Sequence, residues 1–174
     1  MLRRTALVLS LFLGTAVLTT ACTQSDPSTP QYWIEKLSSE ARKAAIKKLG
    51  EMEAKEAVAP LIEAYEAGRY RYDIVAALAR IGDKAAVETL IKAVADLTEP
   101  KAAQLAAATL KEWGMAKGQT ELLVSVILNP KAPKENLYGA LELFAMNPTA
   151  KAIPGLMRIV EGNPELQPIV LNGL

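Results

Sequence analysis

Apolar residues recur along the chain at the spacing of an amphipathic helix, in two alternating sets of segments. The first set covers about 38–50, 72–81, 100–113, 137–144 and 166–174. The second set lies between these segments, at about 55–67, 86–91, 120–128 and 153–160. Apolar and polar residues do not alternate with a period of two over any useful length, so strands are not expected. The pattern predicts an all-α protein.

The first set of segments repeats with a period of about 30 residues. Leu49-Gly50, Ile81-Gly82 and Trp113-Gly114 recur at a spacing of 32, and Phe144-Ala145 follows 31 residues later. Three positions before these pairs stand Ile46, Leu78, Leu110 and Leu141, and Leu174 continues the series. A unit this short cannot bury its own apolar face, so the units must stack on one another.

Helix boundaries follow from capping residues. Ser38 and Ser39 are good N-cap residues for the first segment, and Gly50 and Gly82 are expected to end helices. Pro60 lacks a backbone donor, so it should kink or delay the helix predicted at 55–67.

Three stretches resemble the bacterial HEAT-like repeat that also occurs in phycobilisome-lyase relatives. They are ARKAAIKKLG at 41–50, AVAPLI at 57–62 and AALARIGD at 76–83. The resemblance implies a right-handed α-solenoid of antiparallel helix pairs, about four and a half units long, with the second helices lining a concave face. Polar residues expected on that face are Glu63, Glu88, Lys92, Thr120, Ser125 and Arg158. A tetratricopeptide array is disfavoured, because its Trp-Leu-Gly-Tyr pattern is missing.

The N-terminus has the layout of a secretory signal peptide. Arg3 and Arg4 precede an apolar stretch at 5–18 that is too short for a comfortable membrane span. The segment LTTAC at 18–22 resembles the bacterial lipobox, which implies removal of residues 1–21 and lipidation of Cys22 with palmitate-type chains. A secreted protein without lipid and an uncleaved anchor helix are the alternatives. Thr23 follows the cysteine, and by resemblance to the enterobacterial sorting rule this favours the outer membrane.

Three domains are therefore predicted: a signal peptide at 1–21, a lipidated cysteine with a flexible tether at 22–36, and a HEAT-like repeat domain at 37–174. Residues 23–31 contain no apolar side chain, and their two prolines should keep them extended. Tyr32, Trp33 and Ile34 are expected to cover the first helix of the array.

Composition argues against several classes of function. The chain has no histidine and one cysteine, and it lacks a glycine-rich phosphate loop. No catalytic, cofactor-binding or metal-ligating residue is therefore proposed, and the protein is not expected to be an enzyme. Removing Arg3 and Arg4 changes 20 cationic residues to 18 against 19 acidic ones, a net charge of −1. Such a mixed surface gives no reason to expect nucleic acid.

Two regions are candidates for binding. Arg69, Tyr70, Arg71 and Tyr72 lie in the turn between the first two units, and tyrosine and arginine are enriched in binding hot spots. The alternative is that Tyr72 packs under the next helix and Tyr70 caps the stack. At the other end, Ile169, Val170, Leu171 and Leu174 leave an apolar surface. That surface predicts either a longer array or an end that a partner or a second copy covers.

The main hypothesis is a lipid-anchored scaffold of the bacterial envelope that holds a protein partner. It would face the periplasm or the cell surface. A module that binds or converts a small molecule or peptide in the concave groove is the alternative. A protein that assembles on itself through its ends is a third reading.

Overall fold

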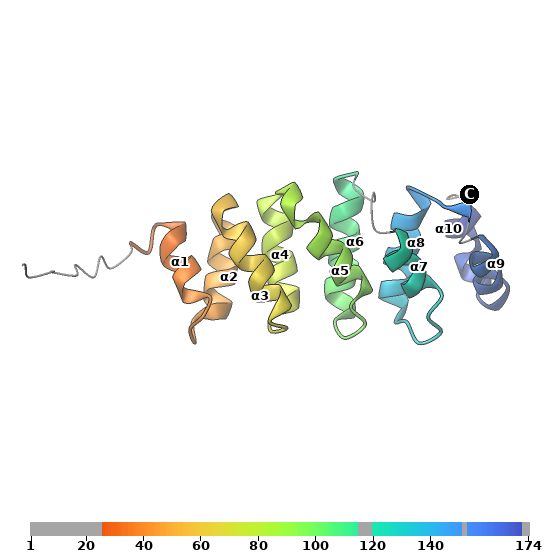
Figure 1. Cartoon of the computed structure of the whole chain (residues 1–174), viewed down its shortest axis with the longest axis horizontal. Coiled ribbons are helices and arrows are strands. Elements are labelled where there is room, and N and C mark those ends of the chain that lie inside the picture. The colour runs from red at the N-terminus through yellow and green to blue at the C-terminus, as the bar shows by residue number, and fades with distance from the viewer. Residues whose placement is uncertain (1–25, 115–119, 151–152, 172–174) are drawn as a thin grey trace, which may run out of the picture.

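A computed structural model describes residues 26–114, 120–150 and 153–171. The predicted signal peptide, Cys22 and Leu174 lie outside these residues. The described part is an elongated array of short helices, with the N-terminal helix at one end and the last helices at the other (Figure 1).

The helices form two rows. The first row consists of α2 (Arg42–Glu51), α4 (Arg71–Ile81), α6 (Pro100–Glu112), α8 (Lys134–Ala145) and α10 (Gln167–Leu171). The second row consists of α3 (Val58–Glu66), α5 (Val87–Ala95), α7 (Thr120–Ile127) and α9 (Ile153–Gly162). Helix α1 (Pro30–Lys36) precedes both rows, and the 3₁₀ turns η1 (Lys55–Ala57), η2 (Lys84–Ala86) and η4 (Pro164–Leu166) precede α3, α5 and α10.

Contacts between the rows follow the order of the chain. Helices α2, α4, α6, α8 and α10 each contact the next in line, and α3, α5 and α7 pack on α4, α6 and α8. Helices are the only regular elements in the described ranges. The prediction of an all-α stack of consecutive helix pairs is confirmed.

One continuous apolar core runs through the array. The four residues of the predicted repeat, Ile46, Leu78, Leu110 and Leu141, are all buried in it. Because successive units contribute to the same core, each helix pair depends on its neighbours for burial.

Two predictions at the start of the array are wrong. Residues 30–36 form α1, which packs on α2, so the tether does not extend to residue 36. Ser39 does not cap α2, because its hydroxyl donates to the Lys36 carbonyl at 2.8 Å and α2 begins at Arg42. Trp33 and Ile34 are half-buried against the core, as expected for residues that cover the first helix.

The equivalent glycines Gly50 and Gly82 have different roles. Gly82 adopts a left-handed conformation with φ of +72° and ends α4, as predicted. Gly50 instead lies within α2, so the prediction that it ends the helix is wrong. A Cβ added to Gly50 would lie 2.9 Å from Cα of Ala77, so the missing side chain allows α2 and α4 to approach closely.

Pro60 is accommodated near the start of a helix. Turn η1 covers residues 55–57, and α3 begins only at Val58, so Pro60 lies in the first turn of α3. A backbone N–H in that turn has no partner within the helix, so its absence costs little. The predicted delay of this helix is confirmed.

Among the described residues, none of the helices combines the length and the apolar character needed to cross a bilayer.

Candidate protein-binding surfaces

The turn at 69–72 displays two tyrosines. Tyr70 adopts a left-handed backbone conformation with φ of +60° immediately before α4, and the Arg69 guanidinium lies 5.5 Å from the centre of its ring. Tyr72, in the first turn of α4, is 45% exposed. The alternative that Tyr72 packs under the next helix is therefore wrong.

Arg71 is held inside the array rather than displayed with its neighbours. Its Nη1 lies 2.6 Å from Oδ2 of Asp96, in the turn between α5 and α6. Its guanidinium also lies 5.3 Å from the centre of the Tyr65 ring. Of the four residues predicted for partner binding, Arg71 thus links two units of the stack.

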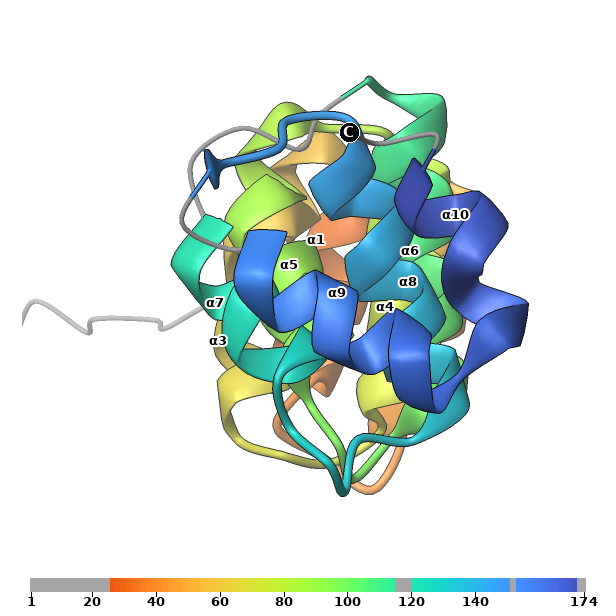
Figure 2. The same ribbon diagram turned by 90° about the vertical axis from the view of Figure 1, so that its right-hand side faces the viewer.

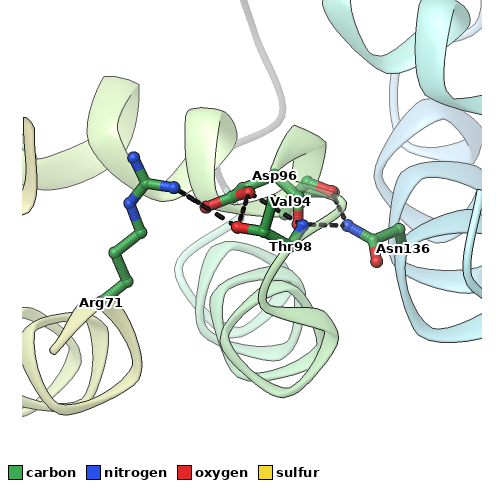
Figure 3. Close-up of polar contacts among 5 residues, drawn as sticks. All are labelled: Arg71, Val94, Asp96, Thr98 and Asn136. Atoms are coloured by element: carbon green, nitrogen blue, oxygen red, sulfur yellow. Dashed lines mark hydrogen bonds and ion pairs between the residues drawn. The ribbon is translucent and has the colours of Figure 1, made fainter. Parts of the chain in front are cut away.

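A polar network fixes the turn that follows α5. The Asp96 carboxylate accepts hydrogen bonds from the Thr98 hydroxyl at 2.6 Å and from the Thr98 backbone N–H at 3.0 Å. From the opposite side, the buried Asn136 side chain of α8 donates to the carbonyls of Val94 and Asp96 at 2.8 and 3.0 Å. Figure 3 shows Arg71 and Asn136 on the two sides of this turn. The network connects α4, the α5–α6 turn and α8.

Sequence reasoning missed Asn136. The signal available was an asparagine on the same helical face as Gly139, Ala140 and Leu143, which are buried in α8. A polar side chain at such a position needs a partner inside the fold.

The environment of Asp96 and Tyr65 shifts their titration. Burial would raise the pKa of Asp96, but the hydrogen bonds from Thr98 and the charge of Arg71 hold that pKa below its ordinary value. Burial, together with the negative charge of Asp96, raises the pKa of Tyr65 to about 12. Asp96 is therefore a carboxylate and Tyr65 a neutral phenol at neutral pH.

The first row of helices carries a groove of about 660 Å³ between α2 and α4. Small residues line it, namely Ala41, Ala44, Gly50, Ala76 and Ala77. Its charged and aromatic lining residues are Glu40, Lys43, Lys47, Tyr72, Asp73 and Arg80. The candidate residue Tyr72 is thus part of a concave surface.

A second groove of about 540 Å³ lies between α6 and α8, lined by residues that include Gln104, Ala108, Tyr138 and Glu142. On the second row, a hollow of about 310 Å³ is lined by Tyr65, Lys92 and Leu122 among others. The expectation that second helices line the main groove is wrong, since both larger grooves lie between first-row helices. Of the polar residues predicted for that groove, Lys92 alone lines one of these three hollows, and it pairs with Glu66 at 3.1 Å.

Comparison with known families concerns the first two helix pairs. A family model described as the PBS lyase HEAT-like repeat matches residues 41–67 and 70–96. These two stretches are HEAT-like repeats. They correspond to α2 with α3 and to α4 with α5, and the later helices continue the same packing. No curated protein matches the chain.

The family match agrees with the resemblance seen in the sequence. It makes this part of the protein a HEAT-like repeat scaffold, a class that commonly binds other proteins. In the HEAT-like repeats, the α2–α4 groove lies where the first helix of one unit meets the first helix of the next.

The Asp96 network should make stability depend on pH. The pKa of Asp96 is lower in the folded chain than in the unfolded chain, so its stabilisation is present above the unfolded pKa, about 3.9. This stabilisation is lost as the pH falls through the lower, folded pKa. We expect Asp96→Asn to lower the free energy of unfolding at pH 7 and to have a smaller effect at pH 2–3, measured by urea unfolding. Asp73→Asn is the control, because Asp73 lies 3.9 Å from the exposed Lys43. Equal effects of the two substitutions at both pH values would contradict this role.

Proposed function

We propose that this protein is a lipid-anchored scaffold of the bacterial envelope that binds a protein partner through its HEAT-like repeats. The observation that carries the proposal is the open groove between α2 and α4, with Tyr72 beside it. An exposed tyrosine next to small residues offers a large rigid contact and room for a partner segment to approach the backbone.

The charges of the α2–α4 groove favour an acidic segment of the partner. Lys43 and Lys47 are one turn apart on α2, and Arg80 lies across the groove on α4. Arg80 makes no ion pair with any residue in the described ranges. Carboxylates of a partner would find cationic groups on both sides of the groove, which promotes association and orientation.

The proposed anchor is Cys22, at the end of the predicted signal peptide. Because α1 begins at Pro30, a leash from Cys22 to the array spans at most roughly 25 Å. A lipid at Cys22 would hold the HEAT-like repeats close to the membrane, with the outer membrane favoured by Thr23.

We infer that the protein does not catalyse a reaction. The sequence has no histidine, and no cluster of metal-binding residues occurs in the described part of the chain. The α2–α4 groove contains two carboxylates, but Asp73 pairs with Lys43 and Glu40 is exposed. The alternative of a small-molecule or catalytic module in the groove therefore has weaker support than protein binding.

Photo-crosslinking of the full chain in native membranes tests the groove. We expect p-benzoylphenylalanine in place of Tyr72 to give one major adduct with a single protein. The same amino acid at Lys101, exposed on α6 and outside the grooves described above, should give none. In the Tyr72-substituted chain, Lys47→Glu combined with Arg80→Glu should reduce the adduct at least about tenfold. No adduct from position 72, or the same adduct from position 101, would contradict the proposal.

A further inference from the structure

The exposed apolar side chains of the protein are concentrated near one end of the array. Seven large apolar or aromatic residues are exposed in the described part, and Tyr70 and Tyr72 account for two of them. The other five lie between residues 128 and 171, and they are Leu128, Met146, Ile153, Met157 and Leu171. Figure 2 looks onto this end, where α9 and α10 lie nearest the viewer with no helix in front of them.

The orientation of α9 shows where its exposed residues point. Gly155 faces α7, because a Cβ added at this position would overlap the Leu128 side chain. Ile153 and Met157 each stand two residues from Gly155, which is about 160° around the helix axis. They therefore lie on the side of α9 away from α7, where the next second-row helix of a longer stack would pack.

The N-terminal end of the array is different, because α1 covers it. Trp33 and Ile34 are half-buried against the core, and the Trp33 indole N–H donates to the Pro27 carbonyl at 2.8 Å. Within the described residues, the apolar face of α9 therefore has no matching open face at the N-terminal end. Copies of the chain have no pair of unlike open ends with which to join head to tail.

We propose that the apolar face of α9, formed by Ile153 and Met157 and bordered by Leu171 on α10, binds the same face of a second copy of this chain. Two copies that meet through identical ends form a closed dimer with two-fold symmetry, the commonest arrangement of homo-oligomers. The contact is also compatible in charge. Exposed Arg158, Glu161 and Glu165 surround this face, so a two-fold arrangement brings groups of both signs from each copy to the rim.

The dimer does not depend on the proposed partner of the α2–α4 groove, since that groove is formed by helices at the other end of the array. Loss of the Tyr72 adduct and loss of the dimer would therefore be separate results. Each can be measured while the other is intact.

The test uses two versions of the full chain produced together, each with a different epitope tag inserted after Ser25, outside the array. Both carry p-benzoylphenylalanine at position 157. Irradiation of membranes should give a species of twice the mass that contains both tags. The same amino acid at Gln104, exposed on α6, should not give it. Ile153→Glu should reduce the two-tag species at least about tenfold, because it places a carboxylate in the apolar contact.

Two results would overturn the proposal. One is the absence of the two-tag species from position 157 while the protein is present at its normal level. The other is an adduct that contains a single tag and a different protein, which would assign the face to another partner. Thermal unfolding of the Ile153→Glu variant should remain within a few degrees of the parent, because Ile153 is already exposed. A much lower midpoint would show that the face is part of the fold and would likewise overturn its assignment to a second copy.

Discussion

Replacing Leu78 or Leu110 by alanine is expected to lower the free energy of unfolding by about 2–5 kcal/mol. Both side chains are fully buried between neighbouring units, on α4 and α6. Their removal would leave cavities in a core that is shared along the array. Urea unfolding followed by circular dichroism measures the change, and for a domain of this size the loss is large enough to expose the array to proteolysis.

Glu88→Ala is the matched control for these two variants. Glu88 is exposed on α5, and its carboxylate lies 3.5 Å from the Lys92 ammonium one turn away, so its removal should change the free energy of unfolding by less than about 0.5 kcal/mol. Comparable losses for Glu88→Ala and Leu110→Ala would mean that the core is assigned to the wrong face of the helices.

Substituting Cys22 by serine is expected to move the protein from the membrane fraction to the soluble envelope fraction, with the fold intact. A serine cannot carry the thioether-linked lipid, and the segment 23–29 contains no apolar residue that could replace the acyl chains. The described helices are also unable to cross a bilayer, so they offer no second anchor within those residues. Fractionation followed by immunoblotting measures the distribution.

Ser25→Ala is the control for the Cys22 variant, because it changes the same segment and leaves the thiol in place. Mass spectrometry should first establish that the signal peptide has been removed from the serine variant. A serine variant that stays with the membrane after removal of its signal peptide would place the anchor elsewhere in the chain.

The heights of the helices in the sequence pattern were predictable, but their ends were less so. Leu78 and Leu110 recur at a fixed spacing, and burial of such positions follows directly from helical periodicity. Ser39 has the residue type of an N-cap, yet its hydroxyl bonds back to Lys36. The hydroxyl can choose between local partners of similar strength, and the presence of α1 decides between them.

The candidate turn shows the same division. Arg69, Tyr70, Arg71 and Tyr72 are adjacent in the sequence and chemically alike in pairs, so composition alone treats them as one cluster. In the structure Tyr72 lies beside a groove, whereas Arg71 pairs with Asp96 from the next turn. This partner is 25 residues away along the chain, and local sequence contains no information about which arginine reaches it.

By itself, the sequence determined that the protein is helical, that its units repeat about every 30 residues and that its core lies at the repeated apolar positions. These properties depend on local periodicity, which each segment carries on its own. The tertiary structure decided that Gly50 lies against Ala77 while Gly82 ends a helix, and that Asn136 is buried where it bonds the α5–α6 turn. It also placed the larger grooves between first-row helices. These features depend on the distance between neighbouring units, and that distance is set by side chains from both units together.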